Sequence, residues 1–239
     1  MKASNHARRD ALVIVAKHPT PGQVKTRLGA TIGLDRSAGL YAAFLRDLRA
    51  RFTVAAATSG YDLIWACAAS DTPMTALLGA DATILQQRGN DFAERLYNSC
   101  RDVATLAYRR TVILGSDSPH VPAETITQAF HALAGFDVVL GPAEDGGYYL
   151  VGVNNWPEPP NLIRGIEMST ERVLRETLAR VGRLGLTHTL LDATFDVDTE
   201  ADLSRLAHAL DTAPCLAPVT QAVLHAILAE RALTDRGRR

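Results

Sequence analysis

The residues of this sequence that are best suited to bind phosphate lie in one segment, KHPTPGQVKTRL. It carries Lys17, Lys25 and Arg27, and Pro21 and Gly22 between them restrict or redirect its backbone. Cations held close together repel one another unless an anion lies between them. The spacing therefore predicts a phosphate-binding loop, and the alternative is a solvated basic loop.

Lysine usage favours the phosphate-binding interpretation of this loop. The 25 basic residues comprise 22 arginines and only three lysines, and two of those lysines are Lys17 and Lys25. An ammonium is a compact point charge, whereas a guanidinium is a wide planar fork, so a lysine is retained where the fork does not fit. Chance clustering remains the alternative. The segment matches neither GxxxxGK[ST] nor GxGxxG, so it is a different kind of phosphate loop from these two.

Two later segments present carboxylates that could hold a divalent cation. Asp117 follows an apolar stretch in the sequence GSDSP, and Asp196 and Asp198 lie two apart in FDVDTE. Magnesium takes carboxylate and phosphate oxygens, and ligands of α/β sheets bind beyond the carboxyl ends of the strands. An Asx-turn at Asp117 and a helix cap at Thr199 would explain the same acids without a metal ion.

A fourth segment, GPAEDGGYY, combines acids with glycines. Glu144 and Asp145 can accept hydrogen bonds from hydroxyl groups, and Gly146 and Gly147 allow a ligand to approach the backbone. Taken alone, the segment is more typical of a glycine-rich turn with two solvated acids. The sequence has no HxH, HExxH, CxxC or GxSxG pattern, which argues against histidine- or cysteine-ligated metals and acyl-transfer nucleophiles.

The elements that must position these segments alternate between strands and helices. The period of the apolar residues predicts strands at 11–16, 61–67, 82–85, 111–116, 136–142, 148–153 and 186–191, and helices at 34–51, 91–107 and 122–133. Three more helices are expected, the first capped by Ser169 and ending at Val181, the second capped by Thr199 and ending at Leu210, and the last opened by Pro214. A Pro-rich loop is expected at 156–161.

This alternation predicts a three-layer α/β/α sandwich on a mostly parallel, mixed central sheet. No crossover helix fits between 136–142 and 148–153, so these strands are either antiparallel or not adjacent. We expect one domain over residues 1–239, with its core at about 11–210 and a C-terminal helix at about 214–233.

Composition excludes several classes of protein. The 239 residues carry a formal net charge of −1, which lacks the basic footprint of a nucleic-acid-binding protein. The sequence has no apolar run of the ~20 residues that span a bilayer and no signal-peptide pattern, so we expect a cytoplasmic protein that binds neither nucleic acid nor membrane.

Taken in order, AKHPTPGQVKTRLG, GSDSP, GPAEDGGYYLVG and DVDTEADL resemble the nucleotide-diphospho-sugar transferase superfamily, which has the glycosyltransferase-A fold. More narrowly, the sequence is similar to the bacterial radical-SAM/selenodomain-associated transferases, relatives of the phospholactate guanylyltransferases. The resemblance covers about residues 11–210. One departure is that GSDSP has a single aspartate where many sugar transferases have DxD.

The resemblance implies roles for individual residues. Lys25 and Asp117 would be catalytic, and Asp117 and Asp198 would hold Mg²⁺ or Mn²⁺. The remaining roles would be phosphate binding by Lys17, Pro21, Gly22, Lys25, Thr26 and Arg27, and acceptor binding by Glu144, Asp145, Gly146 and Gly147.

The activity implied is transfer from a nucleotide or sugar-nucleotide donor to a small-molecule acceptor. We expect a glycosyltransferase that uses an NDP-sugar; the alternatives are a nucleotidyltransferase that joins an NTP to a small phosphorylated acceptor, and a non-catalytic nucleotide-binding module. Three cations and the KTRL ending suit a triphosphate, but Lys17 could instead pair with an acid such as Asp145. Glycosyl transfer stands first because the resemblance to the glycosyltransferase family outweighs a count of charges.

Overall fold

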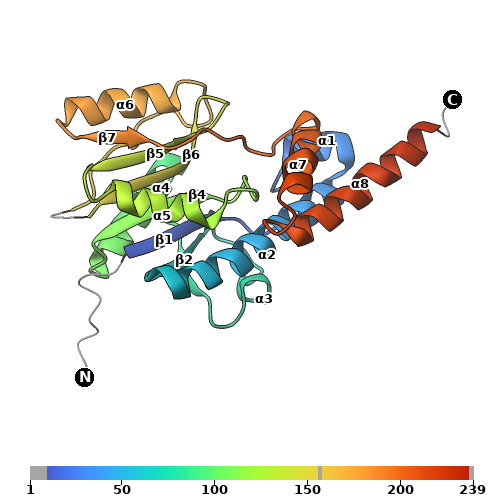
Figure 1. The fold of residues 1–239 in the computed structure, drawn as a ribbon, viewed down its shortest axis with the longest axis horizontal. Helices are drawn as coiled ribbons and strands as arrows, with labels where there is room; N and C mark the ends of the chain where they lie inside the picture. Colours follow the sequence, from blue (N-terminus) through green and yellow to red (C-terminus); the bar gives the residue numbers. More distant parts are fainter. Residues whose placement is uncertain (1–9, 156–157, 237–239) are drawn as a thin grey trace.

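The computed structural model describes residues 10–155 and 158–236 of the chain. Strands and helices alternate along it (Figure 1). The strands are β1 (Asp10–Ala16), β2 (Tyr61–Cys67), β3 (Thr83–Gln86), β4 (Arg110–Gly115), β5 (Val138–Pro142), β6 (Tyr148–Asn154) and β7 (His188–Leu190). The helices are α1 (Thr26–Ile32), α2 (Leu34–Ser59), α3 (Thr75–Leu78), α4 (Phe92–Thr105), α5 (Ala123–Ala132), α6 (Val173–Arg183), α7 (Glu200–Thr212) and α8 (Pro218–Arg236).

The strands form one mixed sheet in the order β3-β2-β1-β4-β6-β5-β7. The strands β3, β2, β1 and β4 run parallel to one another, whereas β6 is antiparallel to both β4 and β5. The predicted mixed sheet is confirmed. The short connection between β5 and β6 makes them antiparallel neighbours, since no crossover helix fits there.

The strand register brings two of the predicted segments together. β1 and β4 are parallel neighbours, and Val15 of β1 lies opposite Gly115 of β4. The loop after β1 and the loop after β4 therefore start side by side at one edge of the sheet. This edge is where ligands of open α/β sheets bind.

Two apolar cores hold the helices on the two faces of the sheet. Along β1, Leu12 and Ile14 face the core built with α2, α5, α7 and α8, and Ala11 and Val13 face the core built with α4 and α6. Successive side chains of a strand point to opposite faces, so one strand serves both cores. The three-layer α/β/α sandwich predicted from the sequence is the observed architecture (Figure 1).

The predicted start of α6 is wrong. Ser169 has a left-handed backbone with φ 63° and caps no helix; α6 begins at Val173 instead. The amide of Leu174, in the first turn of α6, donates to the carbonyl of Gly146 at 2.9 Å. A contact with a distant turn therefore binds one of the amides that a side-chain cap would otherwise satisfy.

The last helix also begins later than predicted, at Pro218 and not at Pro214. The carboxylate of Asp47, buried in α2, accepts hydrogen bonds from the amides of Val219 (3.1 Å) and Thr220 (2.6 Å). A cap supplied by another helix leaves no signal in the local sequence. Pro218 then takes the first helical position, where a proline loses no hydrogen bond.

The remaining differences are small. α2 continues to Ser59, eight residues beyond its predicted end, and the short helices α1 and α3 were not predicted. Two residues of the expected Pro-rich loop, 156 and 157, lie outside the described residues.

Across the part of the chain that the structure describes, no helix is both long and apolar enough to cross a membrane.

Gly152 in β6 tests how tightly the sheet packs. A Cβ atom there would lie 2.5 Å from Cγ1 of Val139, so Gly152→Ala should lower the free energy of unfolding by about 1–3 kcal/mol. Gly182→Ala is the control, because a Cβ at that helical position meets no atom within 4 Å. Chemical denaturation measures both. Equal stability of the Gly152 variant and the wild type would contradict this packing.

Candidate functional site

The centre of the candidate site is the ammonium of Lys25. Its side chain is only 3% exposed, and Nζ forms ion pairs with Asp117 and with Asp198, the latter at 3.0 Å. Arg27, whose side chain is 71% exposed, pairs with the other carboxylate oxygen of Asp198. Residues from three predicted segments thus meet in one cluster.

The backbone fixes the two acids relative to each other. The amide of Val197 donates to the carbonyl of Asp117 at 3.0 Å, which joins the loop after β4 to the segment before α7. Oδ2 of Asp202 accepts from the amides of Asp198 and Thr199, at 3.1 and 2.8 Å. These bonds fix the backbone of Asp198, two residues before α7, and its carboxylate lies beside Lys25.

Lys25 is held in an unusual conformation. Its φ of 47° and ψ of 41° are left-handed, which costs a non-glycine residue of the order of 1–3 kcal/mol. Nζ also lies 5.9 and 5.7 Å from the ring centres of Tyr41 and Phe44. Burial opposes the charge of the ammonium, but the ion pairs outweigh burial, and the pKa of Lys25 is raised above its ordinary value.

A cavity of about 450 Å³, here called the donor cavity, lies at this cluster. Four cations line it, together with Asp117 and Asp198: Lys17, Lys25, Arg27 and Arg95. Thr26 at the start of α1 lines it as well. Tyr41 also lines this cavity. Its hydroxyl lies 2.7 Å from Oγ of Ser116 and accepts a hydrogen bond from the amide of Lys17 at 3.3 Å.

A second cavity of about 360 Å³, the acceptor cavity, adjoins the first and shares Arg27, Asp117 and Asp198 with it. Its other lining residues include Asp145, Gly147, Tyr148, Tyr149, Glu171 and Asp196. Burial and then the charge of Asp117 raise the pKa of Asp196 to about 6, and Oδ1 of Asp196 accepts from the Ser118 hydroxyl at 2.5 Å.

Four of the predicted site residues do not line either cavity. Pro21 and Gly22 belong to the loop itself, where Gly22 adopts a left-handed φ of 78°. Glu144 points to α7, where both of its oxygens accept from Arg205, at 2.7 and 2.8 Å. The backbone of Gly146 instead approaches Glu171 so closely that a Cβ would lie 2.2 Å from its carbonyl oxygen.

Several residues of the site were missed by the sequence analysis. Asp196 was noticed but not chosen over Asp198. Tyr41 counted only as an apolar position of its helix, Gln87 directly follows β3, and Arg95 lies in the helix predicted at 91–107 and was given no role. The position of Gln87 directly after a strand was an available signal, since ligand-binding loops follow the strands of such sheets.

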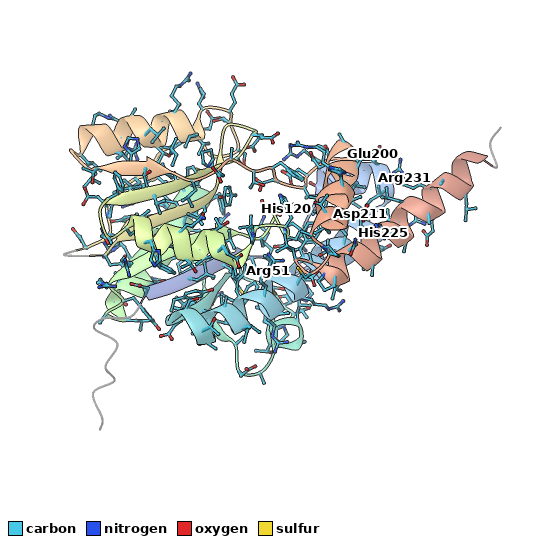
Figure 2. The ribbon with its side chains drawn as sticks, viewed as in Figure 1. Arg51, His120, Glu200, Asp211, His225 and Arg231 are labelled. Atoms are coloured by element: carbon cyan, nitrogen blue, oxygen red, sulfur yellow. The ribbon has the colours of Figure 1, made fainter. Side chains whose placement is uncertain are left out.

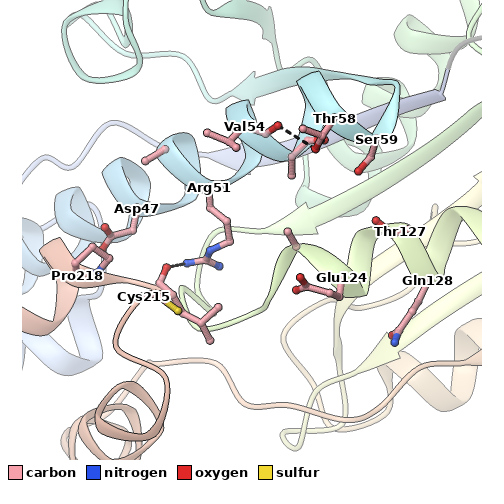
Figure 3. Close-up of a pocket in the computed structure, with 14 residues that line it drawn as sticks. Asp47, Arg51, Val54, Thr58, Ser59, Glu124, Thr127, Gln128, Cys215 and Pro218 are labelled. Atoms are coloured by element: carbon pink, nitrogen blue, oxygen red, sulfur yellow. Dashed lines mark hydrogen bonds between the residues drawn. The ribbon is translucent and has the colours of Figure 1, made fainter.

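Arg51 in α2 anchors the loop that carries Asp117. Its guanidinium donates to the carbonyls of Pro119 (2.6 Å) and Val121 in that loop and to Leu216 in the connection to α8. Arg51 also lines a separate cavity of about 690 Å³ between α2, α5 and the start of α8 (Figure 3). This cavity is larger than the donor cavity, but none of Lys25, Asp117 and Asp198 lines it.

His120, in the same loop as Asp117, is stacked on Phe195 with ring centres 4.3 Å apart. One ring nitrogen of His120 lies 2.8 Å from Oγ1 of Thr194, and the guanidinium of Arg205 covers the Phe195 ring at 4.1 Å. Burial, followed by the positive charges of Arg51 and Arg205, lowers the pKa of His120 to about 4. The neutral imidazole therefore links the Asp117 loop to the segment that carries Asp196 and Asp198, in addition to the hydrogen bond from Val197 to Asp117.

The comparisons with known proteins agree with this architecture. Residues 49–170 match the family model described as "Uncharacterized protein conserved in bacteria (DUF2064)", which is about half of the chain. The chain belongs to the DUF2064 family. No curated protein matches this DUF2064 chain.

Among solved structures, the chain is similar to a protein of Desulfovibrio desulfuricans G20 described as a "putative nucleotide-diphospho-sugar transferase". The two are 30% identical with a TM-score of 0.83, over 92% of this chain and 97% of that one. This similarity confirms the superfamily and fold expected from the sequence.

Within the described residues of this DUF2064 protein, no group of three or more His, Cys, Asp or Glu side chains is arranged to hold a metal ion.

Two more distant structures share the fold. One is 4-diphosphocytidyl-2C-methyl-D-erythritol synthase of Anaerococcus prevotii DSM 20548, with 9% identity and a TM-score of 0.55 over 86% of this chain and 99% of that one. The other is CMP:2-keto-3-deoxy-manno-octonic acid synthetase complexed with CTP, with 12% identity and a TM-score of 0.52 over 85% and 99%.

The lowered pKa of His120 predicts a pH effect on stability. Between pH 6.5 and 4 the unfolded chain protonates this imidazole but the folded chain does not, so the wild type loses stability as the pH falls through this range. His120→Phe keeps a ring for stacking and removes the titration. Denaturation at several pH values should show the variant gaining on the wild type by on the order of 3 kcal/mol from pH 7 to pH 4. Parallel pH profiles would contradict the assignment.

Proposed function

We propose that this DUF2064 protein is a transferase and that its donor cavity binds the phosphate chain of a nucleotide-activated donor. The observation that carries the proposal is the Lys25 ammonium, buried between Asp117 and Asp198 beside Lys17 and Arg27. The cluster lies at the carboxyl ends of β1 and β4, the usual ligand site of such sheets. The similarity to the Desulfovibrio protein supports the same activity.

The chemistry available to these side chains is binding and charge neutralisation. Lys25 and Arg27 can donate to phosphate oxygens and offset the negative charge that develops on the leaving group. The acceptor would lie in the adjoining cavity, where Asp196 can take the proton of an attacking hydroxyl. Holding the two reactants in adjacent cavities supplies the remaining rate enhancement.

The donor set fits a divalent cation that binds together with the donor. Mg²⁺ in nucleotide sites is commonly held by one or two carboxylates with substrate phosphates, and Asp117 and Asp198 offer two carboxylates that share one ammonium. Their side chains are 46% and 28% exposed, so both can be reached from the cavity. When bound, Mg²⁺ or Mn²⁺ would neutralise phosphate charge.

For the reaction class, we place glycosyl transfer from an NDP-sugar first, because the similar Desulfovibrio protein is described as a transferase of that kind. A specific observation favours nucleotidyl transfer as the second candidate. Among the described residues Lys17 has no carboxylate partner, and Asp145 instead accepts from the amide of Gly147 at 2.9 Å. The surplus positive charge that suits a triphosphate is therefore present.

Product analysis tests the proposal and separates the two reaction classes. The protein is incubated with a cell extract and either labelled nucleoside triphosphates or labelled NDP-sugars. Enzyme-dependent transfer of the sugar supports glycosyl transfer, and pyrophosphate release from the triphosphates without sugar transfer supports nucleotidyl transfer. Tight nucleotide binding with neither product would instead favour a non-catalytic nucleotide-binding module.

Removal of the Lys25 ammonium should weaken nucleotide binding. For Lys25→Ala we expect a loss of about 1–3 kcal/mol in binding free energy, the range for a charge-assisted hydrogen bond. Calorimetric titration measures this loss, and circular dichroism checks the fold. The control is Arg36→Ala, which removes a surface ion pair with Glu230 outside the cavity. Unchanged affinity in the Lys25 variant would show that the buried ammonium is a structural ion pair and not a phosphate ligand.

The two acids should be required for any metal-dependent part of nucleotide binding. We expect Asp117→Asn and Asp198→Asn each to reduce the gain in affinity that Mg²⁺ or Mn²⁺ provides, because each removes one charged oxygen ligand. Asp211→Asn, at a surface pair with His225, is the control (Figure 2). If both site variants keep the full metal effect, these acids do not hold the cation.

A further inference from the structure

Arg95 of α4 is a cation of the donor cavity that has no acidic partner among the described residues. It lines the cavity with Lys17, Lys25 and Arg27, yet no carboxylate of the described chain pairs with it. Its Nε is buried without a hydrogen-bond partner. A buried polar nitrogen left unpaired costs free energy unless a ligand or water satisfies it.

The first turn of α4 holds Arg95 firmly in this position. The carboxylate of Asp91 accepts from the amide of Glu94 at 2.7 Å, and the side chain of Glu94 accepts from the amide of Asn90 at 2.9 Å. This reciprocal cap fixes the start of the helix. Phe92 and Arg95, three residues apart, therefore share one face of the helix.

Phe92 supports the guanidinium. The charged carbon of Arg95 lies 5.8 Å from the centre of the Phe92 ring, which is within the range of a cation–π contact. Phe92 is 38% exposed although it is aromatic, and it lines both cavities. A guanidinium held against a ring loses less conformational freedom when it binds an anion.

The donor cavity is lined by more cations than carboxylates. Its two carboxylates, Asp117 and Asp198, already pair with Lys25 and Arg27. Lys17 and Arg95 remain without acidic partners among the described residues. Two uncompensated cations at one cavity attract an anion with several charges.

We propose that Arg95 is a phosphate-binding residue of the donor site, which extends the phosphate site from the Lys25 cluster to α4. Its ligand is a polyphosphate chain, since the guanidinium fork matches the geometry of phosphate oxygens. The proposal rests on the proposed function for the nature of the donor. It assigns a binding role to a helix that the sequence motifs do not include.

The test compares Arg95→Gln with Arg101→Gln in the same helix. Arg101 lies over the ring of Tyr97 at 6.0 Å but lines neither cavity, so it matches the stacking of Arg95 without its position. The probes are inorganic tripolyphosphate, and a nucleoside with its mono-, di- and triphosphates, titrated by calorimetry at two salt concentrations. Circular dichroism checks that both variants fold.

We expect Arg95→Gln to lose at least fivefold in affinity for tripolyphosphate and for the nucleoside triphosphate, with a weaker dependence on salt. Arg101→Gln should match the wild type. Arg95→Lys, which keeps the charge but not the fork, should lie between the wild type and the Gln variant, and it also serves if the Gln variant does not fold.

Two results would overturn the role of Arg95. One is wild-type affinity of the Arg95 variants for tripolyphosphate and triphosphate; the other is an equal loss for the unphosphorylated nucleoside, which would place Arg95 at the base or the ribose. Failure of the proposed function looks different, because the wild type would then bind no nucleotide while tripolyphosphate binding still depends on Arg95. A wild type that binds neither probe contradicts both proposals.

Discussion

The site depends on the compensation of one buried positive charge. An ammonium removed from water loses its hydration and keeps its charge only where neighbouring groups offset that loss, and the side chain of Lys25 is almost fully buried. The two acids that compensate it come from segments far apart in the chain, after β4 and before α7. The ion pairs therefore tie three distant segments into one cluster, and the left-handed backbone of Lys25 is tolerated because of them.

The fold provides this arrangement through its parallel centre and two further links. The register of β1 and β4 starts two of the loops side by side, and the hydrogen bond from Val197 to Asp117 adds the third segment. Arg51 and the stack of His120 on Phe195 support the Asp117 loop from outside the cavities. The cavities also differ in charge, since the cations gather in the donor cavity while Asp145, Glu171 and Asp196 line only the acceptor cavity.

Much of this was predictable because the signals are local. Apolar runs predicted the strands, the short link between β5 and β6 predicted a mixed sheet, and the type and position of Lys25, Asp117 and Asp198 pointed to one edge of it. What could not be predicted depends on contacts between distant residues. The start of α8 depends on Asp47, that of α6 on Gly146, and Glu144 turns to Arg205 instead of the acceptor cavity. Arg95 was missed because the role proposed for it depends on its having no acidic partner among the described residues, which a sequence does not display.

The most direct measurement of the central claim is a crystal structure of the protein with a bound nucleotide. The account predicts phosphate oxygens within hydrogen-bond distance of Lys25 Nζ, in the cavity between the loop after β1 and α4. A nucleotide whose phosphates lie elsewhere, with Lys25 still enclosed by Asp117 and Asp198 and touching no phosphate, would show that the buried ammonium is a structural ion pair and would contradict the account.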